Sequence, residues 1–395
     1  MSAFLSNLEP TRTRIDWQLL QEERWKRMRG IMKDEGIDAI FTNVVDSVIY
    51  LTGWPKHRTS VYPGAYGTLF LQDDVPPVLF CSEGDAGGML ADMMYPDIRV
   101  TPPWNAKWMP VIDKALSDYG LKKKNIGIEN RMPAGLYNNI VNTFDKVNFV
   151  NAVPAINRSR AVKNAEEIKA YEHTVSLVEC GINAAIDAAK NSWSQYTEID
   201  IGTIGMVELL NRGCTGPDIW VVSGERAAPV RRYSTDKIVR AGEMCVIDGP
   251  GSFNGFRSEF ARTVWTGGKP SKQQKKIYQT VYQSLEEAKK IMKPGTKTSA
   301  LEKACLKPVK EAKLEKWYGG YPYTGHGIGI RAEAFNVTAR YKEMDTVLEE
   351  GMILNLEPAI WQDGVGGCRI EDTYLVTKKG CRVLSRSPYD DDLLG

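Results

Sequence analysis

Hydrophobic and polar positions follow two different periods along the first third of the chain. Residues 21–36, QEERWKRMRGIMKDEG, carry apolar side chains three and four positions apart, which predicts an amphipathic helix that ends at Gly36. The short apolar runs that follow are bounded by turn residues and predict strands: IDAIFTNV, VIYLTGW, GTLFLQ and PPVLFCSEG. Short strands among helices indicate an α/β domain.

The pattern changes after residue 157. Residues 159–191 form one long amphipathic stretch, and helical spacing returns in 197–213, 270–295 and 298–314. Strand-like runs lie between and after these stretches: IWVVSG, EMCVID, FRSEFARTVWTG, MILNLEPAIW and CRIEDTYLVT. Helices grouped around antiparallel hairpins predict an α+β domain. We therefore expect two domains, residues 1–157 and residues 158–395.

Composition narrows the class of protein. A chain of 395 residues exceeds the size at which a single core keeps growing. Its 51 basic and 49 acidic residues nearly balance, which argues against nucleic acid as a partner. No run of about 18 apolar residues occurs, and the N-terminus has no signal-peptide pattern, so we expect a cytoplasmic protein with no membrane partner. Seven cysteines without paired spacing predict free thiols.

A glycine-rich hairpin carries the first candidate chemistry. In IDGPGSFNGFRSEFART, residues 247–263, the strand EMCVID ends at Asp248 and FRSEFARTVW returns with Glu259. An offset of eleven residues across such a turn can bring the two carboxylates side by side. The alternative is one solvated carboxylate and one at a turn.

A second pair of carboxylates lies near the C-terminus. Glu357 and Glu371 stand in apolar runs, where a buried carboxylate is costly unless a positive group meets it. Arg369 or Arg262 would make a structural ion pair, and a metal would serve equally well. Glycines flank His326 in GYPYTGHGIGI, so the backbone there can approach a ligand closely.

Taken together, these strings resemble the successive motifs of the creatinase/prolidase superfamily. The resemblance rests on IDGPGSFNGFRSEFART, GHGIGI, GMILNLEPAI and RIEDTYLVT, with SRAVKNAEEI and VIYLTGW similar to stretches that open the C-terminal domain and lie in the N-terminal domain. It covers nearly the whole chain. It implies a small creatinase-like α/β domain followed by a pita-bread domain, and a homodimer.

The resemblance also implies a metal site. In the superfamily's metallopeptidases five positions bind two divalent cations, and here they fall on Asp248, Glu259, His326, Glu357 and Glu371. Glu259 stands where metal-binding members have aspartate. Four carboxylates and one imidazole suit Mn, Fe or Co, and we expect no nucleotide cofactor. Without metal, crowding would raise at least one carboxyl pKa and create a general acid or base.

Two histidines of those metallopeptidases are replaced in this chain. The resemblance puts Arg231 at one of these positions and Glu333 at the other. Arginine can hold a substrate carboxylate bidentately, and Trp54 and Tyr62 would offer aromatic faces to a cationic group. We therefore expect these four residues to bind substrate. The replacements favour the small-molecule members, which include creatinase, ectoine hydrolase and dimethylsulfoniopropionate lyase, over the aminopeptidases.

These features predict a hydrolase that cleaves a C–N bond of a small polar or zwitterionic compound with water activated at the five-residue cluster. Glu357 is expected to take the proton of the attacking water and His326 to face the substrate. Glu259 would become base or nucleophile if no metal binds. The alternatives are an Xaa-Pro dipeptidase or aminopeptidase, a lyase similar to dimethylsulfoniopropionate lyase, and a non-catalytic binding module.

Overall fold

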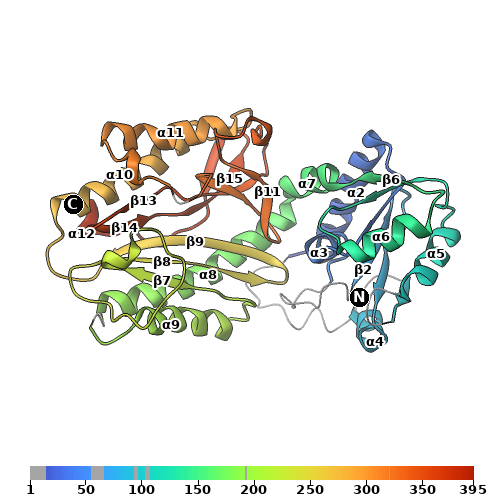
Figure 1. Cartoon of the computed structure of the whole chain (residues 1–395), viewed down its shortest axis with the longest axis horizontal. Coiled ribbons are helices and arrows are strands. Elements are labelled where there is room, and N and C mark those ends of the chain that lie inside the picture. The colour runs from blue at the N-terminus through green and yellow to red at the C-terminus, as the bar shows by residue number, and fades with distance from the viewer. Residues whose placement is uncertain (1–14, 55–65, 93–96, 103–106, 192–193, 320) are drawn as a thin grey trace. The chain divides into compact units, whose positions relative to one another are not determined.

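A computed structural model describes residues 15–54, 66–92, 97–102, 107–191, 194–319 and 321–395 (Figure 1). The chain separates into an N-terminal unit, Met1–Arg160 with Asn164–Lys169, and a C-terminal unit, Ala161–Lys163 with Ala170–Gly395. Both units mix helices and strands, as expected for the fold class. The domain boundary after residue 157 stays a prediction.

The N-terminal unit is built on one mixed sheet. Among the described residues its strand order is β4-β3-β2-β1-β5-β6. Strand β1 pairs antiparallel with β2 and parallel with β5, and a helix connects the two strands of each consecutive parallel pair, β3–β4 and β5–β6. The strands are β1 Ala39–Thr42, β2 Gly67–Leu71, β3 Val78–Cys81, β4 Ile98–Val100, β5 Asn125–Ile128 and β6 Asn148–Asn151; the helices are α2 Trp17–Glu35, α3 Val45–Thr52, α4 Glu83–Asp92, α5 Met109–Asp118, α6 Ala134–Thr143 and α7 Val153–Ala161.

The C-terminal unit places its sheets between pairs of helices. Figure 1 shows α8 and α9 along β7, β8 and β9, whereas α10 and α11 cover the other side of the unit. The helices are α8 Ala165–Asn191, α9 Glu198–Asn211, α10 Lys272–Ile291, α11 Thr298–Glu311 and α12 Asp391–Leu394. The short 3-10 turns are η2 Gly224–Ala227, η3 Glu315–Trp317 and η4 Lys342–Met344.

Three sheets make up the strands described in this unit. One has the order β7-β8-β9, one has the order β11-β10-β12-β15-β16, and β13 pairs with β14. Their bounds are β7 Trp220–Ser223, β8 Met244–Phe253, β9 Phe256–Trp265, β10 Gly325–Ile328, β11 Ala332–Asn336, β12 Ile353–Leu356, β13 Ala359–Gln362, β14 Gly366–Arg369, β15 Asp372–Thr377 and β16 Gly380–Val383. Backbone hydrogen bonds between Ala261 and Glu371 tie β9 to the joint between β14 and β15.

The stretch VIYLTGW is helical, so the expected strand is wrong. Its residues belong to α3, which is buried from Asp46 to Thr52 and ends at Gly53 with φ at 72°. Residues with β-branched and aromatic side chains favour strands on pleated, half-buried surfaces. Burial on all sides removes the periodicity that would have identified a helix.

The stretch 159–191 is interrupted rather than one helix. Helix α7 ends at Ala161, and α8 begins at Ala165. The backbone N–H of Glu167 donates to Asn164 Oδ1 at 2.8 Å, and the Asn164 N–H donates to Glu167 Oε2 at 3.0 Å. This reciprocal capping sets the start of α8.

Two general expectations can be compared with the described residues. All seven cysteines are free thiols in the structure, as expected. Within the described ranges, no helix combines the length and apolar character needed to cross a membrane.

Candidate active site

The β8–β9 hairpin places Asp248 and Glu259 on one face. Asp248 pairs with Ala261 and Pro250 pairs with Glu259, so the two carboxylates are diagonal neighbours. The hairpin is longer than expected, because β8 continues past Asp248 and the turn is only Asn254-Gly255. Both turn residues have positive φ, 47° and 84°, as a two-residue hairpin turn requires.

The other two carboxylates stand where strands break. Glu357 follows β12, and Pro358, which has no N–H for a ladder, separates it from β13. Glu371 lies between β14 and β15. Each expected single strand is thus two strands in different sheets, and the carboxylates lie at the joints. Asn355 fixes Glu371, since its Nδ2 donates to Glu371 Oε1 at 2.8 Å and to the Glu259 carbonyl at 2.9 Å.

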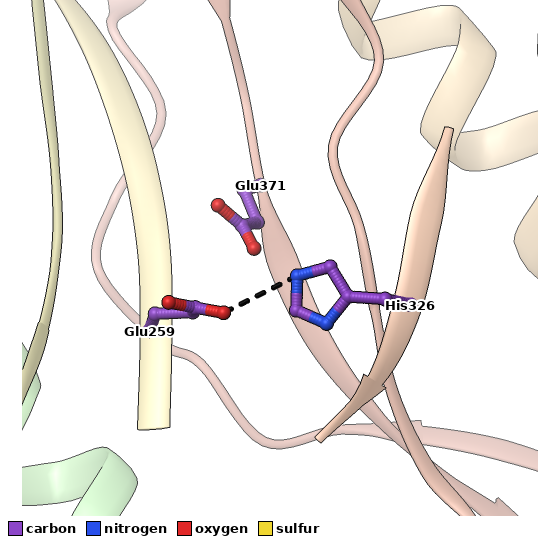
Figure 2. A group of neighbouring side chains, drawn as sticks. All are labelled: Glu259, His326 and Glu371. Atoms are coloured by element: carbon purple, nitrogen blue, oxygen red, sulfur yellow. Dashed lines mark ion pairs between the residues drawn. The ribbon is translucent and has the colours of Figure 1, made fainter. Parts of the chain in front are cut away.

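His326 meets these carboxylates from β10 (Figure 2). Its Nε2 lies 3.2 Å from Glu259 Oε1 and 3.8 Å from Glu357 Oε1. Its Nδ1 lies 2.9 Å from the Gly327 carbonyl oxygen, which fixes the orientation of the ring. A Cβ on the preceding Gly325 would lie 2.1 Å from the Asn355 carbonyl oxygen, so only glycine allows this approach of β10 to β12.

Mutual repulsion and burial shift the acidic groups. Burial raises the pKa of Glu371 well above its usual value, and the neighbouring carboxylates raise it further. Burial raises the pKa of Asp248 to about 6, although Arg369 opposes the shift. Burial also acts to raise the pKa of Glu259, but His326 and Arg257 outweigh it and lower that pKa to about 2. Burial alone would lower the pKa of His326, whereas its acidic neighbours, Glu259 first, raise it to about 10.

Arg369 is the positive group that meets Glu357. Its guanidinium lies 2.6 Å from Asp248 Oδ2 and 3.3 Å from Glu357 Oε2, and all three side chains are buried. Arg262, the other candidate, instead pairs with Asp372 at 2.8 Å. The ion pair foreseen as an alternative to a metal is therefore present. It occupies one side of the cluster only.

The remaining side of the cluster fits a metal ion. Glu259, His326 and Glu371 each offer one ligand atom, and these atoms lie within 4.8 Å of one another. Figure 2 shows the two carboxylates turned toward the imidazole. Oxygen ligands with one imidazole suit divalent transition metals, and a cation there would relieve the repulsion that raises the Glu371 pKa.

Of the four residues expected to bind substrate, the structure describes the side chains of two, Arg231 and Trp54. Arg231 donates from Nη1 to the carbonyls of Arg226 and Pro229, at 2.7 and 3.3 Å, and so braces its own loop. Trp54 packs on the buried cluster of Val48, Tyr66, Leu79 and Cys81 in the N-terminal unit. Tyr62 lies outside the described residues. Glu333 belongs to β11, and its side chain also lies outside what the structure describes.

A pocket that the sequence did not indicate adjoins Glu357 and Arg369. Tyr321 and Tyr323 stack with ring centroids 5.0 Å apart, and the Tyr323 ring meets His326 edge-on at 6.1 Å. Tyr323 and Tyr321 lie two and four residues before the motif GHGIGI, and this proximity is the sequence signal that points to them. The pocket is lined by Tyr318, Gly319, Tyr321, Tyr323, Thr324, Arg340, Glu357, Pro358, Ala359 and Arg369.

Comparison with known proteins identifies relatives that cover 93% of this chain. The chain is 26% identical over 372 residues to the Xaa-Pro dipeptidase of Pyrococcus furiosus, covering 93% of this chain and 98% of the relative. Among solved structures, the Xaa-Pro dipeptidase from Bacillus anthracis has a TM-score of 0.80 at 24% identity, and the prolidase from Pyrococcus horikoshii OT3 has a TM-score of 0.78 at 24% identity. These structures cover 93% of this chain, which covers 98% and 99% of theirs.

The relatives favour the peptidase alternative over the expected closeness to small-molecule members. Residues 24–162 match the Creatinase/Prolidase N-terminal domain, and residues 164–378 match Metallopeptidase family M24. Proteins of this family use divalent metals, in keeping with the ligand atoms that Glu259, His326 and Glu371 bring together. The chain is thus a creatinase/prolidase-like hydrolase and belongs to metallopeptidase family M24.

Proposed function

We propose that this chain is a metal-dependent hydrolase that cleaves the C–N bond of a short, carboxylate-bearing substrate, with Xaa-Pro dipeptides as the first class. The proposal rests on one observation: Glu259, His326 and Glu371 each bring a ligand atom close enough to the other two to bind the same cation. The adjoining pocket is lined in part by Glu357. The names of the relatives support the choice of dipeptides.

Each residue of the cluster has a role in this proposal. Glu259, His326 and Glu371 would hold the first ion, and Asp248 and Glu357 would join them in holding a second. A bound divalent ion supplies a water of lowered pKa and polarises a substrate carbonyl. Glu357 is placed to accept a proton because it lines the pocket. Arg369, 3.3 Å away, fixes the orientation of its carboxylate.

The test is a substrate panel with the full chain loaded in turn with Mn, Fe and Co. The proposal predicts that proline is released from Ala-Pro, that chelation abolishes the release, and that added metal restores it. Failure to cut any dipeptide with any of the three metals contradicts the proposal. Sedimentation of the same samples tests the homodimer, which is also proposed.

A small polar or zwitterionic compound is the second candidate substrate class. It is favoured by the two positions at which the resemblance puts Arg231 and Glu333 in place of the histidines of the peptidases. Creatine, ectoine and dimethylsulfoniopropionate therefore belong in the same panel. Hydrolysis of a C–N bond of creatine or ectoine, without cleavage of any dipeptide, would select this candidate, and release of acrylate from dimethylsulfoniopropionate would identify a lyase.

A further inference from the structure

Arg262 is a buried arginine whose charge partner is not one of the five cluster residues. It stands on β9, three residues after Glu259, and is only 1% exposed. Its Nη2 pairs with Asp372 Oδ1 at 2.8 Å, and Asp372 is fully buried as well. Burial acts to lower the pKa of Arg262, but the charge of Asp372 outweighs it and raises that pKa, so the guanidinium stays ionised. Because Asp372 directly follows Glu371, this ion pair lies one residue from a proposed metal ligand.

The N–H groups of the Arg262 guanidinium are matched by acceptors. Nη1 donates to the backbone carbonyls of Glu371 and Ala261, at 2.8 and 2.9 Å. Nε and Nη2 both donate to the Ser387 carbonyl, at 2.9 and 2.8 Å, and Nη2 also donates to Asp372. These five hydrogen bonds equal the five donors that a guanidinium carries in a rigid plane. Arg262 therefore fixes the Glu371 carbonyl relative to Asp372 and Ser387.

The backbone of Glu371 depends on such contacts because it lies between two strands. Strand β14 ends at Arg369 and pairs with β13, whereas β15 begins at Asp372 and pairs with β12. The Glu371 N–H donates to the Ala261 carbonyl at 3.0 Å. The Glu371 carbonyl accepts from the Ala261 N–H at 3.4 Å and from Arg262 at 2.8 Å, so the shorter of these two bonds comes from the arginine.

A C-terminal segment, residues 384–390, holds both members of the ion pair. It supplies the Ser387 carbonyl that accepts from Arg262. Two of its hydroxyls donate to Asp372, from Ser385 at 2.6 Å and from Tyr389 at 2.7 Å. The Tyr389 ring also lies beside the guanidinium, with its centroid 4.9 Å from the guanidinium carbon. These contacts come from outside the cluster, so they hold Arg262 in place independently of an ion.

We propose that Arg262 is a positioning residue of the metal site, which fixes the backbone of Glu371 so that its side chain stays within reach of the ion. This inference rests on the proposed function, because it concerns the ion that the proposed reaction uses. The side chain of Glu371 is held separately by Asn355. A ligand that is already ordered loses little conformational freedom when the ion binds, and this strengthens binding.

Mn binding to the full, metal-free chain tests the role of Arg262. Arg262→Lys keeps a positive charge beside Asp372, but an ammonium lacks the planar fork that contacts Glu371 and Ser387 together. Loss of a group that orients a metal ligand weakens metal affinity by about 10- to 100-fold, and we expect the Mn dissociation constant to rise by that factor. Titration calorimetry measures the constant, and circular dichroism shows whether each sample is folded before Mn is added.

Two matched controls separate positioning from stability. Arg24→Lys makes the same change at another buried arginine, which pairs with Glu167 at 2.7 Å in the N-terminal unit. Val309→Ala leaves a cavity in the core of the C-terminal unit, where Val309 is fully buried. All three variants should unfold at lower urea concentration than the wild type. Only Arg262→Lys should change the Mn dissociation constant by more than about twofold, because a purely structural residue does not alter binding by the folded chain.

Tyr389→Phe is a milder variant that serves if Arg262→Lys does not fold. It keeps the ring beside the guanidinium and removes the hydroxyl that donates to Asp372. The Mn dissociation constant should rise by about 3- to 10-fold, because one hydrogen bond that holds the ion pair is lost. An unchanged constant in this variant would contradict the inference.

The outcomes distinguish this inference from the proposed function. An unchanged Mn dissociation constant in folded Arg262→Lys, or an equal rise in Val309→Ala, contradicts the role of Arg262 alone. Mn binding that depends on Arg262 in a chain that cuts no dipeptide supports the role of Arg262 and contradicts the proposed function. A wild-type chain that binds none of Mn, Fe and Co contradicts both.

Discussion

At the scale of the residue, Glu357 has two effects. It is the proposed proton acceptor, and its charge shifts the pKa values of the neighbouring cluster residues. It pairs with Arg369, and it is the neighbouring carboxylate that contributes most to raising the pKa of Glu371. Its removal therefore costs its pairings with Arg369 and His326 and relieves its repulsion with Asp248 and Glu371. These opposing effects make it possible to separate activity from stability at this position.

We expect Glu357→Gln to lower turnover by at least about 100-fold, because the proton acceptor is lost. The melting temperature should stay within a few degrees of the wild-type value, since Asp248 still pairs with Arg369. Steady-state kinetics and thermal melts of the same preparation measure both. Unfolding of the variant would instead identify Glu357 as a structural carboxylate.

Glu129 offers a residue-scale prediction for the N-terminal unit. Burial raises its pKa, and its carboxylate accepts hydrogen bonds from the hydroxyls of Thr42 and Ser47. A raised folded-state pKa favours the protonated form in the fold. The associated stability is fully present below the pKa of the unfolded chain and is lost as the pH rises through the folded-state pKa.

Glu129→Gln removes this titration. Relative to the wild type, the variant should therefore gain stability as the pH increases from 4 to 8, and the difference should grow above the ordinary glutamate pKa. Thermal melts at several pH values measure the difference. A difference that is constant with pH would show that Glu129 ionises as freely in the fold as in the unfolded chain.

The residue scale also explains which site residues could be predicted from the sequence. The five cluster residues lie in motifs whose order along the chain matches a known family, so they could be named. The pocket that Tyr321 lines could not, because it brings together residues from Tyr318 to Arg369 that belong to different loops and strands. The contacts of Arg231 depend on local loop geometry, and neighbouring arginines look alike in a sequence.

At the scale of the element, the close pairing of β10 and β12 positions His326. A Cβ on Gly325 would meet the backbone of Asn355 at 2.1 Å, and backbone cannot rotate away. The same β12 residue orients Glu371 through its side chain. One strand pairing therefore sets the positions of two proposed metal ligands.

We expect Gly325→Ala to force β10 away from β12. The substitution should destabilise the C-terminal unit by about 1–3 kcal/mol and lower metal affinity together with activity. Gly380→Ala is the matched control, because a Cβ there has no neighbour within 4 Å among the described residues. Chemical denaturation and metal titration of both variants provide the comparison, and equal behaviour of the two would contradict the account.

Helices and strands could be predicted where apolar residues recur at a regular spacing or where a glycine or proline marks the end of the element. Helix α2 was found because its apolar spacing is regular and Gly36 stops it. Helix α3 was mistaken for a strand because its burial on all sides leaves no polar face. The breaks at Glu357 and Glu371 were missed because each pair of strands reads as one apolar run, whereas Pro358 and the change of sheet separate them.

At the scale of the whole molecule, the two-domain organisation followed from chain length and from the change of pattern near residue 157. The preference for small-molecule relatives did not hold, because it rested on single replacements, whereas the comparisons weigh 93% of the chain. Substrate class depends on a few side chains around the pocket. Family and fold depend on the pattern of the entire sequence.

The central claim is that the cluster of Asp248, Glu259, His326, Glu357 and Glu371 works with bound metal. The most direct measurement is the metal content per chain, by plasma mass spectrometry of protein purified without chelator or nickel affinity resin, alongside Ala-Pro hydrolysis as Mn, Fe or Co is added back. The account predicts one to two bound ions per chain and activity that rises in proportion to occupancy. A chain that binds no metal, and that metal neither stabilises nor activates, would contradict it.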